Sequence, residues 1–232
     1  MHWSYRYVNR TVLAVGRWVE RMGAIVPGTD GAEAFGSFGA GSYISYPHGT
    51  RYGLSSVHIG QDTLIGRNTA LIVGYSPDDE HIPPRGLVVG DRCVLGAGLR
   101  ATAHESITIG DDVWFGQDVF ISDASHGYQN PETPIGTQLG RHEPVVIGSG
   151  SWIGHGVVIL PGTTIGRQVV VGAGSVVRGT VPDHTVVAGV PAKVVRRLEP
   201  GVGWVATGSG DVRPAWTTEQ VEAALRGEIE LF

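Results

Sequence analysis

The chain has 232 residues, of which 41% are hydrophobic and 17% charged, and its formal net charge is −5. This composition predicts a folded protein with a buried core rather than a disordered chain, and the acidic balance argues against a large basic surface for nucleic acid. The single cysteine excludes an intrachain disulfide, and without a cysteine pair nothing indicates a structural zinc site. No apolar run reaches the roughly 18 residues of a membrane span, so we expect a cytoplasmic protein without an integral membrane segment.

Residues 1–34 are predicted to form an N-terminal helical extension. Apolar side chains recur there at alternating steps of four and three residues, the period of one helix face, and arginines surround them: Val8, Val12, Val15, Val19 and Met22, with Arg6, Arg10, Arg17 and Arg21. We expect this helix to cover the open end of the repeat region described next, or to pack on a neighbouring subunit. Binding to a membrane surface through its basic side is the alternative.

An apolar residue followed by glycine recurs at a spacing of six along the middle of the chain, in successive pairs: Ile59-Gly60 and Ile65-Gly66, Val89-Gly90 and Leu95-Gly96, Ile109-Gly110 and Phe115-Gly116, Ile147-Gly148 and Ile153-Gly154, Ile165-Gly166 and Val171-Gly172. A third hexad in each unit lacks the glycine and is marked by a different set of apolar residues: Leu71, Ala101, Ile121, Ile159 and Val177. Four places after each apolar residue comes a small or β-branched one, such as Thr63, Cys93 or Ser151. The repeating unit is therefore three hexads, or 18 residues.

A period of six fits neither a lone helix nor a lone hairpin, but it fits a strand and a turn repeated around a three-sided prism. We predict an all-β-dominated chain with a parallel β-helix over residues 35–198, in which the apolar residues point inward. The glycine is expected near a corner, where a left-handed backbone conformation is cheap only without a Cβ. The small residue fills the corner from inside, so Cys93 is interpreted as a packing residue rather than a nucleophile.

The hexads and the stretches 121–135 (ISDASHGYQNPETPI) and 186–195 (VVAGVPAKVV) together resemble the left-handed β-helix acyltransferases with hexapeptide repeats. That group contains galactoside, maltose, polysaccharide and xenobiotic O-acetyltransferases, and the resemblance covers about residues 54–198. It implies a left-handed coil, a homotrimer with active sites between subunits, and acyl transfer from acyl-CoA, with acetyl-CoA as the expected donor. The implied acceptor is a hydroxyl of a sugar or another small polyhydroxylated compound. Transfer to an amine stays open, because the same base would serve.

Three insertions interrupt the prism, at about residues 73–87, 102–108 and 123–145. Each leaves the coil after the face that lacks glycine, so in a stacked prism all three should emerge at one corner. Loops gathered on a rigid scaffold commonly carry function. These loops bring polar and titratable side chains together, and we expect four of them to bind the acceptor: Tyr75, His104, Glu105 and Asp123.

His126 is the candidate general base. Attack of a hydroxyl on a thioester needs a group that removes the hydroxyl proton, and histidine as a residue type titrates near neutral pH. His126 lies at the root of the longest insertion, where the resemblance places the family's catalytic histidine. We expect Asp123 or Glu105 to orient its imidazole.

A cluster of cations in the last coils is the candidate site for coenzyme A. Arg178, Lys193 and Arg196 lie there in an otherwise acidic chain that has no other lysine, and the phosphates of coenzyme A favour such cations. The resemblance adds three residues along the groove for pantetheine, the second of which stands where the family usually has a small residue: Gly154, His155 and Ala173. We expect no metal requirement. The sequence has no P-loop and no dinucleotide-binding glycine motif.

The middle face of the prism carries a column of outward apolar residues: Leu64, Val94, Trp114, Trp152 and Val170. Such a column is too apolar for solvent, and one such face on a three-sided prism suits a cyclic trimer. Coverage by a terminal helix is the alternative.

After Leu198 the repeats stop, and residues 199–232 are predicted as a C-terminal tail. We expect a loop over Gly201–Pro214 and a short helix over Thr218–Arg226, which begins with the capping-box spacing of Thr217 and Gln220.

Two other classes of function share the predicted prism. The γ-type carbonic anhydrases hold zinc with three histidines, two of them five residues apart on one strand. Here Ile121 stands five before His126 and Pro131 five after it, so the histidine pair that such a zinc site needs is absent from the sequence. A non-catalytic scaffold is the second alternative, and a test of coenzyme A binding would distinguish it from an enzyme.

Overall fold

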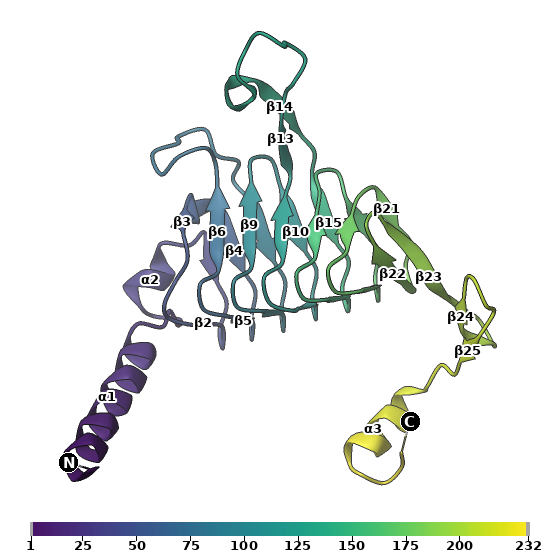
Figure 1. Ribbon diagram of the computed structural model, residues 1–232, viewed down its shortest axis with the longest axis horizontal. Helices are drawn as coiled ribbons and strands as arrows, with labels where there is room; N and C mark the ends of the chain where they lie inside the picture. Colours follow the sequence, from purple (N-terminus) through teal and green to yellow (C-terminus); the bar gives the residue numbers. More distant parts are fainter. Residues whose placement is uncertain (1, 231–232) are drawn as a thin grey trace.

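The hexads form a parallel β-helix whose three sheets run along the sides of a prism, as the computed structural model of residues 2–230 shows (Figure 1). The first sheet contains β1 (Ser37–Phe38), β4 (Val57–Ile59), β7 (Leu87–Val89), β10 (Ile107–Ile109), β15 (Val145–Ile147), β18 (Thr164–Ile165) and β21 (Thr180–Val181). The third contains β3 (Arg51–Tyr52), β6 (Ala70–Val73), β9 (Arg100–Ala103), β12 (Phe120–Ser122), β17 (Val158–Ile159) and β20 (Val176–Val177).

The second sheet is the longest because it continues beyond the coils. Its parallel part is β2 (Tyr43–Ile44), β5 (Leu64–Ile65), β8 (Val94–Leu95), β11 (Trp114–Phe115), β16 (Trp152–Ile153), β19 (Val170–Val171) and β22 (Thr185–Gly189). Three antiparallel strands then extend it: β23 (Ala192–Glu199), β24 (Gly203–Ala206) and β25 (Val212–Arg213). The last two strands lie where we expected a loop, so that prediction is wrong. Antiparallel pairing, of β24 with β23 and of β25 with β24, forms them rather than a hexad pattern.

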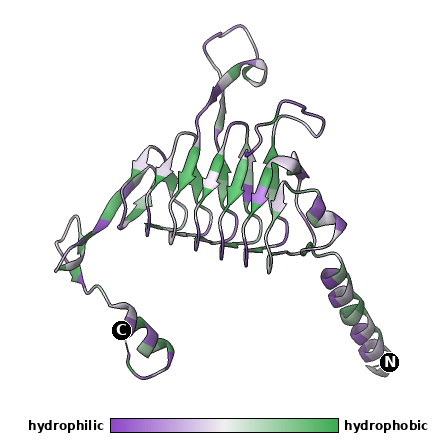
Figure 2. Cartoon of the chain, turned by 180° about the vertical axis from the view of Figure 1, so that it is seen from behind, coloured by the Kyte–Doolittle hydropathy of each residue, from purple (hydrophilic) through white to green (hydrophobic). Residues whose placement is uncertain are grey.

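The register of the third sheet confirms the predicted coil length. Ile121 pairs with Ala101 on one side and with Ile159 on the other, as successive hexads without glycine should. All three side chains are buried in one continuous apolar core, and Figure 2 shows the hydrophobic strands alternating with more polar turns. The small residue at each corner is also buried. Burial raises the pKa of the Cys93 thiol, which agrees with a packing role for this side chain.

The hexad glycines serve a different purpose from the one expected. The left-handed backbone conformation occurs two residues after them, as at Asp62 (φ 52°) and Gly98 (φ 77°), and not at the repeat glycines themselves. Those glycines are required because successive coils approach closely. A Cβ on Gly154 would lie 2.6 Å from the backbone nitrogen of Ala173 in the next coil, well inside van der Waals contact.

The N-terminal helix does not cover the end of the prism, contrary to one of our expectations. Helix α1 (His2–Met22) leads away from the first coil (Figure 1), and every residue from Tyr5 to Met22 is exposed. The end is covered instead by the segment that follows, in which Ile25 and Phe35 join the core and α2 (Asp30–Glu33) forms one turn. None of the helices within residues 2–230 is long and apolar enough to cross a membrane.

The C-terminal helix forms as predicted. Helix α3 (Thr218–Leu225) begins with a complete capping box. The backbone N–H of Gln220 donates to Thr217 Oγ1 (3.2 Å), and the backbone N–H of Thr217 donates to Gln220 Oε1 (2.9 Å). The division of the chain at residues 34 and 198 into three parts stays a prediction.

The three insertions emerge at one corner, as expected. They follow β6, β9 and β12, which are neighbours in the third sheet, with Val73 paired to Ala103 and Thr102 to Ser122. The longest insertion forms an antiparallel hairpin of β13 (Ala124–His126) and β14 (Leu139–His142), which stands above the body in Figure 1. The short 3-10 helices η1 (Leu54–Ser56) and η2 (Ile135–Thr137) complete the described elements.

Candidate active site

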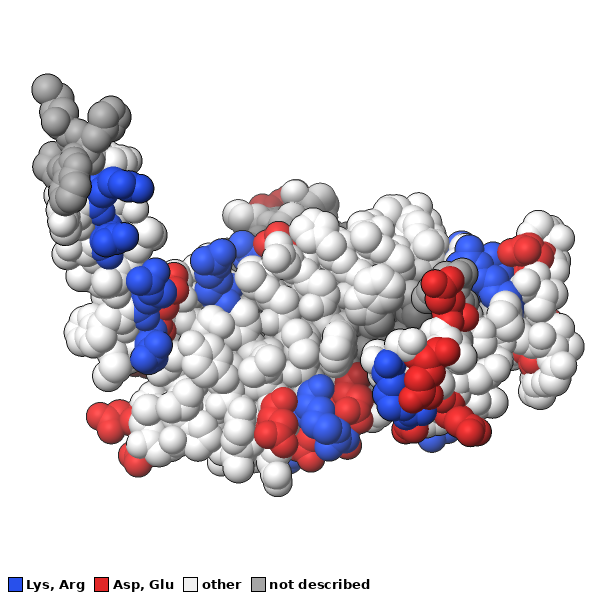
Figure 3. All heavy atoms as spheres, turned by 90° about the horizontal axis from the view of Figure 1, so that it is seen from below, with Lys and Arg blue, Asp and Glu red and all other residues white. Residues whose placement is uncertain are grey.

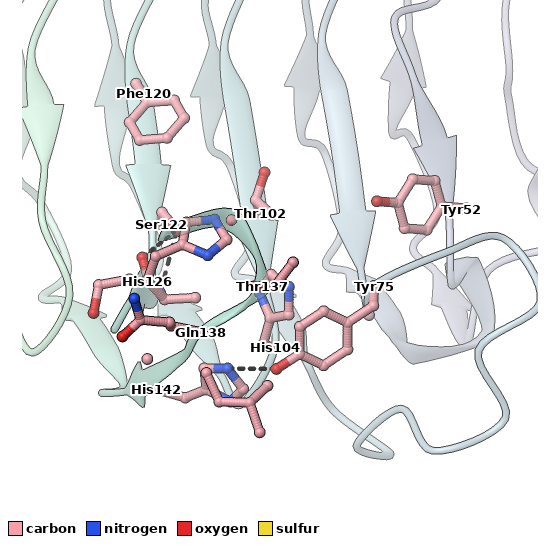
Figure 4. Close-up of a pocket in the computed structure, with 16 residues that line it drawn as sticks. Tyr52, Tyr75, Thr102, His104, Phe120, Ser122, His126, Thr137, Gln138 and His142 are labelled. Atoms are coloured by element: carbon pink, nitrogen blue, oxygen red, sulfur yellow. Dashed lines mark hydrogen bonds between the residues drawn. The ribbon is translucent and has the colours of Figure 1, made fainter. Parts of the chain in front are cut away.

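A cavity of about 580 Å³ lies where the hairpin stands over the outer face of the third sheet. Its floor comes from the sheet and its wall from the insertions (Figure 4). The lining residues are Tyr52, Gly74, Tyr75, Thr102, His104, Phe120, Ser122, Ala124, Ser125, His126, Gly136, Thr137, Gln138, Leu139, Gly140 and His142. The structure thus brings together three of the residues singled out from the sequence, Tyr75, His104 and His126, and adds a third histidine, His142.

His126 is the last residue of β13 and lines the cavity. Its position depends on the hairpin, in which His126 pairs with Leu139 and Ala124 with His142, with an irregularity between them. The residue is exposed. A histidine that is open to the cavity and held by a paired strand can meet a substrate hydroxyl without a rearrangement of the fold.

Asp123 has a different role from the one expected. Its side chain is 0% exposed and does not line the cavity, so it cannot contact an acceptor there. The backbone N–H groups of His104 and Glu105 donate to its carboxylate, each at 2.8 Å. These donors belong to the two-residue bulge after β9 and have no strand partner, and buried donors need one. The carboxylate therefore holds the bulge, and the expectation that it orients His126 is not supported.

Glu105 also departs from the expectation. Its backbone is held by Asp123, whereas its side chain is exposed and does not line the cavity. The bulge thus turns only one of its two predicted acceptor ligands, His104, toward the cavity.

His104, His142 and Tyr75 form one packed cluster in the cavity wall. The tyrosine hydroxyl lies 2.7 Å from His142 Nε2, and the ring centroids of Tyr75 and His104 are 4.4 Å apart. His104 Nδ1 is buried without a hydrogen-bond partner and lies 3.8 Å from Asp123 Oδ1. Burial lowers the pKa of His104, while the Asp123 carboxylate opposes that shift. Burial, the larger of the two effects, thus favours the neutral form of the imidazole.

The cluster has too few metal ligands for a metal site. Within residues 2–230, no three side chains of His, Cys, Asp or Glu are grouped so that they could hold a metal ion.

The role of Asp123 can be tested by stability. Asp123→Ala should lower the free energy of unfolding by about 2–4 kcal/mol, because two partly buried N–H donors lose their buried, charged acceptor. Urea unfolding followed by circular dichroism measures this change. Glu105→Ala is the matched control, since it removes a carboxylate that is exposed, and it should change stability by no more than about 0.5 kcal/mol. Equal losses in the two variants would contradict the role of Asp123 at the bulge.

The predicted coenzyme A residues lie elsewhere in this chain. Gly154 and His155 follow β16 and Ala173 follows β19, which are strands of the second sheet, so these residues occupy the corner between the second and third sheets. None of them lines the cavity around His126. A single chain therefore does not bring the candidate base and the candidate pantetheine groove together.

The predicted phosphate-binding cations differ in whether their charged groups are exposed or bound to other residues of the chain. Arg178 and Lys193 are exposed, Lys193 on the hairpin strand β23 opposite Ala188. Arg196 is held internally instead, because its guanidinium donates to Asp211 Oδ2 at 2.7 Å and to the carbonyl of Trp204 at 3.2 Å. The structure thus assigns Arg196 to the C-terminal extension, so it is not a free cation for a phosphate.

The outward column of the second sheet is exposed and continuous. Trp114 pairs directly with Trp152 across neighbouring strands, and their side chains are 59% and 56% exposed. Val94 and Val170 continue the column on either side. Neither terminal helix covers these two tryptophans, which removes the alternative explanation for the column.

Tyr52, Phe120 and Gln138 line the cavity, although the pattern of the hexads did not select them. His142 also lines it, as a titratable residue of the longest insertion that we expected near this corner. His142 faces the cavity because β14 pairs with β13 in a particular register, and a register within an insertion leaves no period in the sequence. The outward positions of the third sheet, which supply Tyr52 and Phe120, could have been found by alternation along β3 and β12.

Comparison with known proteins agrees with this architecture. Residues 144–179 match the family described as bacterial transferase hexapeptide (six repeats), and residues 56–103 match the hexapeptide repeat of succinyl-transferase. The chain is 46% identical over 121 residues to a putative lipopolysaccharide biosynthesis O-acetyl transferase of Escherichia coli, covering 49% of this chain and 62% of that protein. It is 30% identical over 166 residues to the galactoside O-acetyltransferase of Escherichia coli, covering 72% and 66%.

Among solved structures, a galactoside acetyltransferase in complex with coenzyme A superposes with a TM-score of 0.51 at 28% identity, covering 61% of this chain and 64% of that one. The matched regions thus span about two thirds or less of the curated relatives. The fold and the cavity together define a hexapeptide-repeat β-helix protein with a cleft lined by histidines. The chain belongs to the hexapeptide-repeat acetyltransferase family.

Proposed function

We propose that this protein is an acyl-CoA-dependent O-acyltransferase that moves an acetyl group from acetyl-CoA to a hydroxyl of a sugar or another small polyhydroxylated acceptor. The observation that carries the proposal is His126, which opens into a cavity that two further histidines also line, built on a hexapeptide β-helix. The relatives whose names specify O-acetyl transfer, and the related acetyltransferase that binds coenzyme A, support this choice of donor and acceptor.

In this mechanism His126 is the general base. Its imidazole removes the proton of the acceptor hydroxyl as that oxygen attacks the thioester carbonyl, and the same proton then passes to the departing thiolate. The remaining lining groups position the acceptor. Thr102 offers a hydroxyl on the floor, and the Tyr75–His142 pair closes one side. The side-chain amide of Gln138 is hydrogen-bonded to Asn130 and Thr133 within the insertion, so it shapes the wall instead.

The proposal includes a homotrimer with a left-handed coil in each subunit. The base and the pantetheine groove occupy two different corners of one prism, so a complete site needs the groove of a neighbouring chain beside the cavity of the first. The exposed tryptophan column supplies an apolar face for such an assembly. A cytoplasmic location and the three-part division of the chain belong to the same proposal.

The proposed reaction is tested by release of free thiol from acetyl-CoA in the presence of candidate acceptors. Sugars that differ only by a hydroxyl or an amine at one carbon form the informative pairs. Faster acetylation of the hydroxyl members supports O-transfer. Faster acetylation of the amine members would show an N-acyltransferase, and no binding of coenzyme A at all would show a non-catalytic β-helix.

Lys193 provides a separate test of the cofactor site. Lys193→Gln should weaken coenzyme A binding by roughly tenfold while leaving dephospho-coenzyme A nearly unaffected, if its ammonium group meets the 3′-phosphate. Calorimetry at low and high salt measures both, and the effect should shrink at high salt because an exposed contact is screened. Arg226→Gln, just after the C-terminal helix, is the control. Equal weakening of both ligands would place the 3′-phosphate elsewhere.

A further inference from the structure

Helix α1 has a wide apolar face that this chain leaves uncovered. At 3.6 residues per turn its apolar side chains from Trp18 to Tyr5 span an arc of about 140°, with four valines at the centre: Val8, Val12, Val15 and Val19. Met22 lies between these valines and Trp18, and two aromatic rings stand at the margins of the arc, Trp18 on one side and Tyr5 on the other. All these side chains are exposed, Trp18 by 63%.

The charged side of α1 is equally ordered. Four arginines fall within an arc of about 60° on the same projection: Arg6, Arg10, Arg17 and Arg21. Glu20 is the one acidic residue of the helix, and Leu13 lies near the arginines. Figure 3 shows the basic side chains following one another along the helix, in a molecule whose formal net charge is −5.

Three properties of α1 favour a lipid surface over a protein groove as the partner of its apolar face. The aromatic rings lie at both margins of the apolar arc, where a half-inserted helix places them at the level of the headgroups. The arginines are concentrated on the helix although the whole chain is acidic, which complements an anionic surface. The helix also stands off the prism (Figure 1), so its face is accessible without unfolding.

We propose that α1 is an interfacial anchor that lies in the surface of a bilayer containing anionic lipid. Its valine face enters the headgroup–acyl boundary and its arginines meet lipid phosphates. Such a helix lies on the membrane rather than across it, in keeping with the absence of a spanning helix within residues 2–230. This surface is independent of the cavity around His126 and extends the proposed function with a location for the acceptor reaction.

The test is flotation of the full chain with vesicles of phosphatidylcholine, with and without phosphatidylglycerol. The protein should float with the anionic vesicles and stay behind with the neutral ones. Arg17→Gln combined with Arg21→Gln should weaken binding by about tenfold or more, and high salt should weaken the parent in the same way. Val12→Gln combined with Val19→Gln should abolish flotation even though all four arginines remain.

The matched control is Arg67→Gln combined with Arg226→Gln, which removes the same charge from exposed positions outside the helix and should bind like the parent. Thermal unfolding should be unchanged in every variant, because α1 contributes nothing to the core. Equal loss in the control and in the α1 arginine pair would overturn the proposal. The proposal would also be overturned if the parent bound neither kind of vesicle. If the valine variant then differed from the parent in mass by light scattering, the face would be assigned to a second copy of the chain.

Discussion

Replacing His126 with alanine is expected to lower kcat by about 10²–10⁴-fold, which is the usual contribution of a positioned general base. The KM for acetyl-CoA should change little, because the predicted cofactor residues lie at another corner of the prism. Steady-state kinetics with a saturating acceptor measures both quantities. The variant should unfold at nearly the same temperature as the parent, since His126 is exposed and belongs to an insertion outside the core.

His81→Ala is the matched control for this experiment. His81 lies in the first insertion, is exposed and does not line the cavity, so its loss should leave kcat within about twofold of the parent. If a well-folded His126→Ala protein keeps activity within tenfold of the parent, another group acts as the base. His142 would then be the next candidate, because it lines the same cavity through β14.

The double substitution Trp114→Glu with Trp152→Glu should dissociate the oligomer into single chains. The two rings are neighbours on adjacent strands, so the variant would bury two carboxylates side by side in the apolar interface that we propose, without partners. Light scattering measures the mass. Activity should fall to a few per cent or less, roughly the loss that follows when a site is left incomplete, because the cavity and the groove then lie on separate molecules.

Thr108→Glu with Val146→Glu is the control for this face. These residues are also neighbours on adjacent strands and exposed, but they belong to the first sheet. The variant should keep the mass and most of the activity of the parent. If the tryptophan variant keeps its mass too, the second sheet is not the interface, and the proposal that a neighbour completes the site loses its physical basis.

The coils were predictable because the same hexad pattern recurs in every coil. Ile121 could be placed against Ala101 and Ile159 by counting alone, and the structure pairs them. The shared corner of the insertions followed from the same count. The reason for the glycines did not, because a period reports where a residue recurs and says nothing about which atoms of the next coil it faces. The close approach of Gly154 to Ala173 exists only once the coils are stacked.

The site was predictable where it depends on the coil and unpredictable where it depends on the insertions. Tyr75, His104 and His126 were placed near one corner by their distance from a strand, and they do line one cavity. The role of Asp123 was predicted wrongly because its carboxylate accepts hydrogen bonds from two backbone N–H groups. Those groups come together only when the bulge folds. His142 and the internal ion pair of Arg196 depend on strand pairings outside the hexads, for which the sequence carries no periodic signal.

The two ends of the coil stack differ in how they protect their open edges. A parallel stack could in principle continue into another molecule, because its terminal strands present unpaired backbone groups to any similar edge. Here an antiparallel bridge between Ile25 and Ile44 meets the first coil, and β23 covers β22 with reversed polarity at the other end. The outermost strand, β25, has two residues and offers little to pair with. The second sheet therefore ends on both sides in antiparallel pairing rather than in a strand that would continue the parallel stack.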